Sequence, residues 1–272
     1  MVERDLRPVG DTQVLASVSN AARLLKEFGK GDREIGVSEL ARRLGLGKST
    51  THRLLHTLTV EKLLEQDTDT GGYRLALTMH ELGASVQSAI DLHSASNPVI
   101  EQLRNITKET VQIAVLDGRH VVYVERRESP QTVRLFGRVG HRNDAHSTST
   151  GKVLLAHLPA ADLDVLLAGW RLPRKTQYTI SDQATLRAQL QIVLGQGWAE
   201  NVNESEVGVA SIAAPIRDSR GVVVAALSIA GPLTRMEGAT LRRYVRPVTE
   251  AAAAISRRMG YAESSNRKEG AP

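Results

Sequence analysis

The stretch that most constrains the fold is residues 37–56, VSELARRLGLGKSTTHRLLH. Up to Leu44 its apolar residues recur at the spacing of an amphipathic helix, and Gly45 can end that helix in a left-handed conformation. A second helix is predicted over residues 48–63, after a short turn. The residues expected on its inner side are Leu54, Leu55, Leu58 and Val60.

A further helix is expected before this pair. Apolar residues recur at helical spacing over residues 18–28, with Ser19 or Asn20 able to cap the start and Gly29 able to end it. Residues 1–13 are polar and show no such pattern, so we expect a disordered arm there.

A β-hairpin is predicted after the helices. Residues 63–66 and 73–75 flank the turn-rich segment DTDTGG, and such a turn between short apolar runs is typical of a hairpin. Three helices followed by a hairpin make a winged helix-turn-helix, in which the hairpin is the wing. We expect this domain to span residues 14–76.

Positive charge gathers around the second of the paired helices. Residues 42–53 contain four cationic side chains and no acidic one, a local charge of +4. Lys and Arg contact phosphates or guanine edges, hydroxyls contact phosphates, and a helix N-terminus attracts phosphate through its free N–H groups. The sequence therefore predicts a DNA-binding helix. The residues expected to contact the duplex are Ser38, Arg42, Lys48, Ser49, Thr50, Thr51, His52, Arg53 and, on the wing, Arg74.

Two other interpretations of the basic helix were weighed. A polar helix face with a few cations is often only a solvated surface. Gly47, Lys48 and Ser49 also match the end of a phosphate-binding loop, but Arg42 occupies the position of its first glycine and the preceding segment is helical. The helix spacing and the following hairpin favour DNA binding over both.

Residues 77–97 form the expected connection to the rest of the chain. Their apolar residues continue at helical spacing, and Asn97 followed by Pro98 is the expected break. This linker helix is predicted to pack on its own wing or to lie in a contact between two copies of the chain. We favour both together. Two-fold pairing would supply a second half-site, because one small winged helix makes few base contacts.

The remaining sequence, residues 98–262, predicts an α+β domain with a mainly antiparallel sheet flanked by helices. Two hairpins stand out, one around Asp117-Gly118 and one around residues 218–221, and crossover patterns are few. The expected strands are 110–116, 120–125, 133–136, 211–216 and 222–230. The expected helices are 99–107, 151–157, 160–168, 181–194 and 238–259, and a disordered tail is expected over 263–272.

Signals for catalysis are weak in this second domain. The chain has no cysteine, which excludes disulfides and a cysteine nucleophile, and the neighbouring His141, His146 and His157 lack a metal-binding spacing. We therefore predict no enzyme activity, no metal and no cofactor. Residues 147–151, STSTG, together with Ser211 and Ser228, either fill space or line a cavity for a small polar or anionic ligand.

Composition bears on location. The formal net charge of +5 favours polyanionic partners only weakly, because it does not say where the charge lies. No apolar run reaches the roughly 18 residues of a membrane span, and the first residues lack an apolar signal-peptide core. A cytoplasmic protein without membrane contact is expected.

Several of these segments together resemble the IclR family of bacterial transcription regulators. They are SVSNAARLLKEF, SELARRLGLGKSTTHRLLHTL, GYRLALTMHELG, STSTGKVLLAHLP, and the stretch from GWAENVNESEVGVASIAAPIRD to GVVVAALSIAGPLTR. The resemblance covers residues 15–259. It implies a winged helix-turn-helix, a linker helix and an effector domain similar to the GAF fold, in homodimers or dimers of dimers.

The resemblance also implies an effector pocket in the second domain. Carried onto matching positions, its residues are Leu135, Asn143, Ser149, Thr150, Asn201, Val209, Ser211, Ser228 and Ala230. The chain departs from the family pattern at several of them: Ser211 stands where Cys is frequent, Asn201 at an acidic position, and Ala230 at a serine. Ligands of other members are therefore not transferred to this chain.

The function that these observations predict is a DNA-binding regulator, repressor or activator, whose operator affinity changes with a bound small organic acid or related metabolite. When bound to its double-stranded DNA operator, it would be associated with the bacterial nucleoid. Two alternatives stay open from the sequence: an enzyme acting on a small carboxylate in the second domain, and a purely architectural DNA binder.

Overall fold

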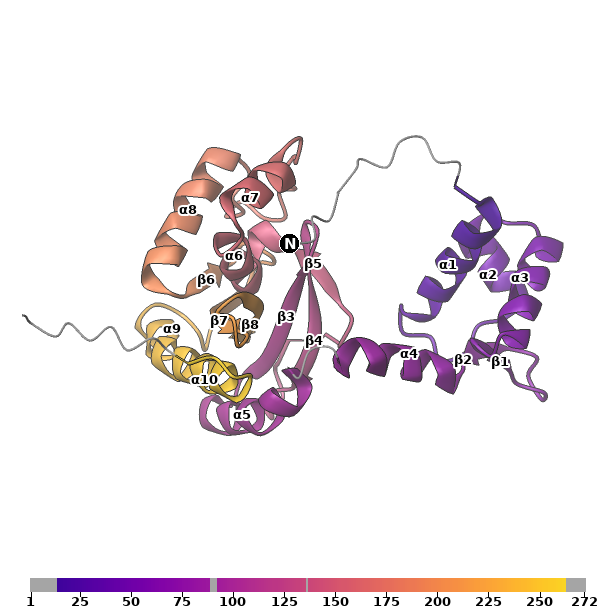
Figure 1. Cartoon of the computed structure of the whole chain (residues 1–272), viewed down its shortest axis with the longest axis horizontal. Coiled ribbons are helices and arrows are strands. Elements are labelled where there is room, and N and C mark those ends of the chain that lie inside the picture. Colours follow the sequence, from indigo (N-terminus) through magenta and orange to yellow (C-terminus); the bar gives the residue numbers. More distant parts are fainter. Residues whose placement is uncertain (1–13, 89–91, 136, 263–272) are drawn as a thin grey trace, which may run out of the picture. The chain divides into compact units, whose positions relative to one another are not determined.

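The computed structural model describes residues 14–88, 92–135 and 137–262 (Figure 1). The chain divides into two compact units, with the boundary between Ala89 and Ile90. The expected disordered arm and tail lie outside the described residues. In the part of the chain that is described, no helix is long and apolar enough to cross a membrane.

The N-terminal unit is the predicted winged helix-turn-helix. Its elements are α1 (Ala16–Phe28), α2 (Val37–Leu44), α3 (Lys48–Val60), β1 (Leu64–Gln66) and β2 (Tyr73–Leu75). The two strands pair antiparallel, and Leu64 lies opposite Leu75. Helix α4 (Leu77–Ser88) follows the wing.

The helix pair closes on a small apolar core as its spacing predicts. Gly45 has φ 65° and ends α2 in the left-handed conformation, which glycine adopts without steric cost. Leu24, Leu40 and Leu55, one from each helix, are fully buried together with Tyr73 of the wing. The core therefore joins all three helices to the hairpin.

Three details of the N-terminal unit differ from expectation. Helix α1 begins at Ala16 and Leu15 is its N-cap residue, so Ser19 and Asn20 lie inside the helix. Helix α3 ends at Val60, whose side chain is 63% exposed instead of inward. The chain leaves α3 early because Lys62 takes a left-handed conformation, φ 57°, which turns it toward β1.

The predicted break at Asn97 and Pro98 is wrong. Helix α5 runs from Leu92 to Thr107 with Pro98 inside it. A proline within a helix removes one hydrogen bond and crowds the carbonyl four residues earlier. Burial of Leu92 and Ile100 on either side of Pro98 keeps the segment helical.

The C-terminal unit contains one six-stranded antiparallel sheet of order β5-β4-β3-β8-β7-β6, which confirms the α+β prediction. The strands are β3 (Thr110–Asp117), β4 (His120–Arg127), β5 (Arg142–Asp144), β6 (Ala199–Val202), β7 (Val209–Arg217) and β8 (Val223–Pro232). Both predicted hairpins, β3–β4 and β7–β8, are present.

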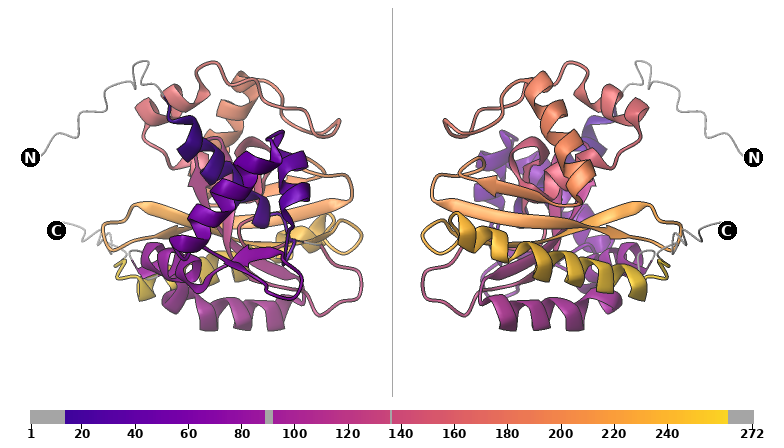
Figure 2. Two further views of the ribbon diagram at one scale, coloured as in Figure 1. Left: turned by 90° about the vertical axis from the view of Figure 1, so that its right-hand side faces the viewer. Right: turned by 90° about the vertical axis from the view of Figure 1, so that its left-hand side faces the viewer.

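Helices cover both faces of this sheet (Figures 1 and 2). Helix α5 and α10 (Val245–Arg258) pack on one face around Ile100, Val248 and Ile255. The opposite face carries α6 (Ser149–Ala156), α7 (Ala160–Leu167) and α8 (Gln183–Gln196), whose buried residues include Leu155 and Leu190.

Two further predictions in this unit are corrected. Residues 133–135 form no strand, and Phe136 lies outside the described residues; the short edge strands β5 and β6 were not anticipated. The single helix expected over 238–259 is two helices, α9 (Ala239–Arg243) and α10, which meet at Tyr244. Pro247 explains the break, because its ring would crowd the Arg243 carbonyl in a continuous helix.

Candidate nucleic-acid interface and ligand cavity

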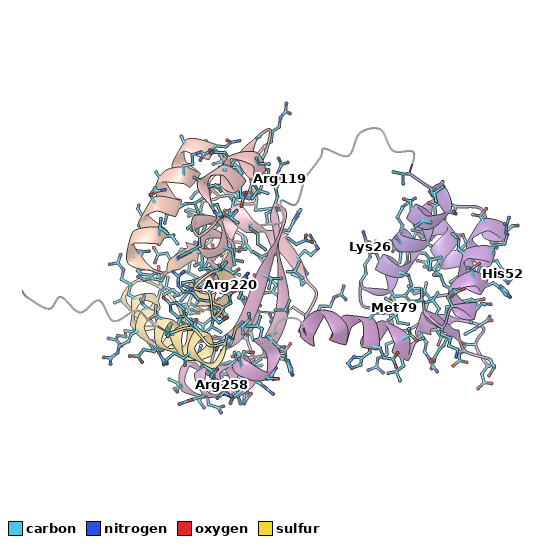
Figure 3. All side chains as sticks on the ribbon, viewed as in Figure 1. Lys26, His52, Met79, Arg119, Arg220 and Arg258 are labelled. Atoms are coloured by element: carbon cyan, nitrogen blue, oxygen red, sulfur yellow. The ribbon has the colours of Figure 1, made fainter. Side chains whose placement is uncertain are left out.

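Helix α3 presents an exposed polar face at its N-terminus. Gly47 precedes the helix and supplies no side-chain cap, which leaves N–H groups of the first turn free to attract an anion. Figure 3 shows His52 extending from the outer side of α3. The exposed side chains predicted to contact DNA are Lys48, Ser49, Thr50, His52 and Arg53, and all except Thr50 border one surface hollow together with Val37.

Thr51 is the exception on this helix. Its side chain is fully buried and its hydroxyl donates to the Gly47 carbonyl at 3.1 Å. The structure therefore does not support a DNA contact by Thr51, because part of each helical turn faces the core even within a polar run.

The predicted local charge is partly neutralised. Arg42 donates to both carboxylate oxygens of Glu39, at 3.0 and 2.6 Å. Arg43 donates to Glu39 at 2.7 Å and to Asp32 at 2.6 Å. Hydrogen bonds from Arg42 and then Arg43 lower the pKa of Glu39 to about 2, so this carboxylate is ionised at neutral pH.

Other predicted contact residues differ in their pairing. Arg74 on the wing pairs with Glu65 at 3.1 Å and Asp67 at 3.9 Å. Ser38 is exposed in the first turn of α2. Among the described residues, Lys48 and Arg53 form no ion pair, so a polyanion can bind their charges without displacing a carboxylate.

A cavity of about 290 Å³ lies against the sheet of the C-terminal unit. Cross-strand pairing explains how distant residues meet there, because directly opposite residues share a face of the sheet. Arg126 of β4 lies opposite Gln112 of β3. Ala230 of β8 lies opposite Ser211 of β7, which lies opposite Asn201 of β6. The lining residues are Gln112, Tyr123, Arg126, Arg134, Leu135, Gly137, Arg138, His141, Asn143, Thr148, Asn201, Ser205, Glu206, Val209, Ser211 and Ala230.

Six of the nine residues predicted for the effector pocket line this cavity. They are Leu135, Asn143, Asn201, Val209, Ser211 and Ala230. Ser149, the first residue of α6, lies behind the wall with its Oγ 2.7 Å from Ser211 Oγ. Thr150 and Ser228 are buried but do not line the cavity, so for these two residues the structure does not support a contact with a ligand.

The prediction missed the most unusual residue of the cavity, Arg126. Its side chain is only 8% exposed, and it donates to Gln112 Oε1 at 2.7 Å and to the Leu135 carbonyl at 2.6 Å. Its Nε atom is buried without a hydrogen-bond partner, and its ion pair with the exposed Glu128 spans 4.0 Å. Burial lowers the pKa of Arg126.

A β-bulge explains why the alternation of residues along β4 does not predict the face on which Arg126 lies. The register between β3 and β4 shifts between Ile113 and Ala114, so Tyr123 and Arg126 both line the cavity although they are three residues apart. Strict alternation would place residues 123 and 125 on one face instead. The sequence therefore offered no reliable signal for the face that Arg126 occupies.

A buried ion pair fixes one wall of the cavity. Lys152 of α6 is 2% exposed and its Nζ lies 2.6 Å from Glu204, which follows β6. The Glu204 amide donates to Asn201 Oδ1 at 2.9 Å, and Asn201 Nδ2 donates to Ser205 Oγ at 2.9 Å. The pair thus ties α6 to the loop that supplies Ser205 and Glu206 to the lining. Burial raises the pKa of Glu204.

The three histidines noted in the sequence make different contacts. His146 is buried and contacts the Pro173 carbonyl, His157 contacts the Val153 carbonyl, and His141 lies on the rim of the cavity. The described residues include no group of three or more His, Cys, Asp or Glu side chains that could hold a metal ion.

Comparison with known proteins decides the family. The sequence matches the family "Bacterial transcriptional regulator IclR C-terminal" over residues 84–257 and "IclR helix-turn-helix domain" over residues 17–68. The chain belongs to the IclR family of transcriptional regulators. It is accordingly a regulator with a DNA-binding helix-turn-helix domain and an effector-binding C-terminal domain.

Similar regulators cover nearly the whole chain. KdgR of Escherichia coli is 35% identical over 96% of this chain and 98% of its own length. XynR of the same species is 32% identical over 91% of this chain and 98% of its own length. Among solved structures, an IclR homologue from Microbacterium hydrocarbonoxydans complexed with 4-hydroxybenzoate is 30% identical, with a TM-score of 0.80, over 90% of this chain and 99% of the homologue.

Proposed function

We propose that this IclR-family regulator binds a double-stranded operator through the exposed face of α3, and that a small organic anion in the cavity changes its operator affinity. The observation that carries the proposal is Arg126, a cation on the cavity wall whose side chain is about nine-tenths buried. An ionised group away from water is stable only when it is paired or hydrogen-bonded.

Without a ligand, the guanidinium of Arg126 has neither a full set of hydrogen-bond acceptors nor a close anionic partner. Gln112 and the Leu135 carbonyl are neutral acceptors, Nε has no acceptor, and the Glu128 carboxylate is 50% exposed at 4.0 Å. A ligand carboxylate would form charge-assisted hydrogen bonds with the guanidinium inside a small polar cavity. An anionic effector therefore fits the site better than a neutral or cationic one.

On the DNA side, Lys48 and Arg53 supply charge for phosphates or guanine edges, and Ser49, Thr50 and His52 supply hydrogen-bonding groups next to them. A single winged helix reads a short site. We therefore propose that the regulator acts in the cytoplasm as a homodimer or a dimer of dimers on paired half-sites, associated with the nucleoid when bound.

The regulatory step is a population shift. The effector favours one arrangement of the C-terminal units, and α4 and α5 connect that unit to the winged helix along the chain. A tenfold change in operator affinity needs a coupling free energy of about 1.4 kcal/mol, which a few hydrogen bonds made in only one arrangement supply.

The proposal is tested with the full-length protein. An operator is first selected from a random duplex pool, and its binding is then titrated by fluorescence anisotropy with and without small organic acids. At least one acid is expected to change the affinity about tenfold or more. Arg126→Gln is expected to bind the operator normally and to lose that response. A panel of acids without effect on operator binding would contradict the proposal, and so would a normal response to an effective acid in Arg126→Gln.

A further inference from the structure

The cavity has two chemically different ends, set by the strand order. Arg126 lies on β4, and Arg138 and His141 lie between β4 and β5; Asn201 and Ser211 lie on β6 and β7. Strands β3 and β8 separate β4 from β7. Three spacings of about 4.8 Å make this separation about 14 Å on a flat sheet, less on a curled one.

One end is cationic. Arg126 is the buried cation, and at the exposed rim the side chain of Arg138 pairs with no residue that the structure describes. Arg134, also in the lining, lies 3.2 Å from Glu128. A single carboxylate placed beside Arg126 would meet more positive than negative charge.

The other end carries small hydroxyl and amide groups, with the exposed side chain of Glu206 at its edge. Ser205 Oγ accepts a hydrogen bond from Asn201 Nδ2, which leaves its own O–H available to an incoming group. Ser211 Oγ shares one hydrogen bond with Ser149 and keeps further acceptor capacity. Thr148, which accepts from the Gly151 amide, completes this end.

Between the ends the floor is only partly apolar. Ala230 lies beside Ser211 on the adjacent strand, and its methyl group leaves room above the sheet. The other aliphatic lining residues are Leu135 and Val209. An aromatic ligand lying across this floor would cover hydroxyls and amides without pairing them, which costs about 1–3 kcal/mol for each buried group.

We infer that the effector is a hydroxylated aliphatic carboxylate, with its acid group at Arg126 and its hydroxyls at Ser205 and Ser211. The inference rests on the proposed function, in which the cavity binds a small anion, and adds the class of that anion. A polyhydroxy acid matches both ends at once; a simple fatty acid matches the cationic end, and a polyol matches the hydroxyl end.

The test uses four probes with the full-length protein by titration calorimetry. D-Gluconate has six carbons, a carboxylate and hydroxyls; hexanoate lacks the hydroxyls, sorbitol lacks the carboxylate, and 4-hydroxybenzoate is an aromatic acid. Gluconate is expected to bind at least tenfold more tightly than each of the other three. Tighter binding of hexanoate or 4-hydroxybenzoate would overturn the inference and leave an anion-sensing regulator intact. Absence of binding by every acid would count against both.

Matched variants assign the two ends. Arg126→Gln is expected to weaken the binding of gluconate and of hexanoate alike. Arg142 lies on the neighbouring edge strand and pairs with Asp117 at 2.6 Å, and Arg142→Gln is expected to weaken the binding of neither acid. Ser205→Ala is expected to weaken the binding of gluconate about fivefold and to leave the binding of hexanoate unchanged. The exposed turn residue Ser219, changed to Ala, is its control. An equal loss of affinity for both acids in Ser205→Ala would overturn the assignment of the hydroxyl end.

Discussion

Ser149 Oγ and Ser211 Oγ lie 2.7 Å apart and join the start of α6 to strand β7 behind the cavity wall. Both side chains are buried, at 1% and 6% exposure. A buried hydroxyl that loses its partner retains the cost of desolvation without a compensating hydrogen bond. This contact should therefore contribute to the stability of the C-terminal unit whether or not a ligand is bound.

Replacement of Ser211 tests that contact. Ser211→Ala is expected to lower the free energy of unfolding of the C-terminal unit by about 1–2 kcal/mol, because Ser149 is left unpaired. Urea unfolding followed by tryptophan fluorescence reports on this unit alone, since Trp170 and Trp198 are the only tryptophans. Ser228→Ala is the control, because its hydroxyl makes only a 3.5 Å contact with the Gln112 carbonyl. Equal stability of the two variants would contradict the prediction.

The buried pair of Lys152 and Glu204 should be costly to break from one side. Lys152→Met leaves the Glu204 carboxylate buried without its cation, and a loss of about 3–5 kcal/mol is expected in the same urea assay. Adding Glu204→Gln to that variant should restore part of the loss, because an unpaired charge is removed. Arg246→Ala, in the exposed pair with Glu250, should leave the free energy of unfolding nearly unchanged, because solvent screens that pair. Additive losses at Lys152 and Glu204 would rule out direct coupling.

Lys48 and Arg53 should contribute charge to operator binding. Each change to Ala is expected to weaken binding and to reduce the slope of log affinity against log salt by about 1, because fewer counterions are released. Anisotropy titrations at several salt concentrations measure both quantities. Arg246→Ala, an exposed arginine of the other unit, should leave the slope unchanged. An unaltered slope in Lys48→Ala and Arg53→Ala would exclude phosphate contacts by these side chains.

Glu39 should restrain operator binding. At neutral pH it is ionised, with a pKa of about 2, and it accepts hydrogen bonds from Arg42 and Arg43. Glu39→Gln removes a negative charge and releases both arginines, so tighter DNA binding and a steeper salt dependence are expected at pH 7. Glu237→Gln, in the other unit, is the control for the change in net charge. Weaker binding of Glu39→Gln would show that the ion pairs instead orient the arginines for DNA.

Neighbouring threonines on α3 should separate stability from recognition. Thr51→Val removes the buried hydrogen bond to Gly47 and is expected to speed hydrogen exchange of α3 amides while leaving operator contacts in place. Thr50→Ala should weaken operator binding without changing that exchange, because its side chain is exposed. The opposite pattern would mean that Thr51, and not Thr50, faces the duplex.

Local chemistry in the sequence predicted most of the elements. Gly45 marked the end of α2, Asp117-Gly118 marked a hairpin, and the basic run after Gly47 marked the exposed face of α3. These features depend on backbone conformation or periodicity within a few residues, which a sequence shows directly. The same reasoning failed at Pro98, where burial of the surrounding helix outweighs the preference of proline for a helix end.

The residues that give the cavity its charge and polarity depended on tertiary structure. Six pocket positions followed from family resemblance, but Arg126 required the bulge in the β3–β4 ladder, and the burial of Thr51 required the packed core of the N-terminal unit. The sequence by itself determined the winged helix, the two hairpins and the basic helix pair, because these are local properties. Only the folded sheet decided which side chains share the cavity, because its lining residues lie up to 118 positions apart along the chain, from Gln112 to Ala230, and meet through strand register.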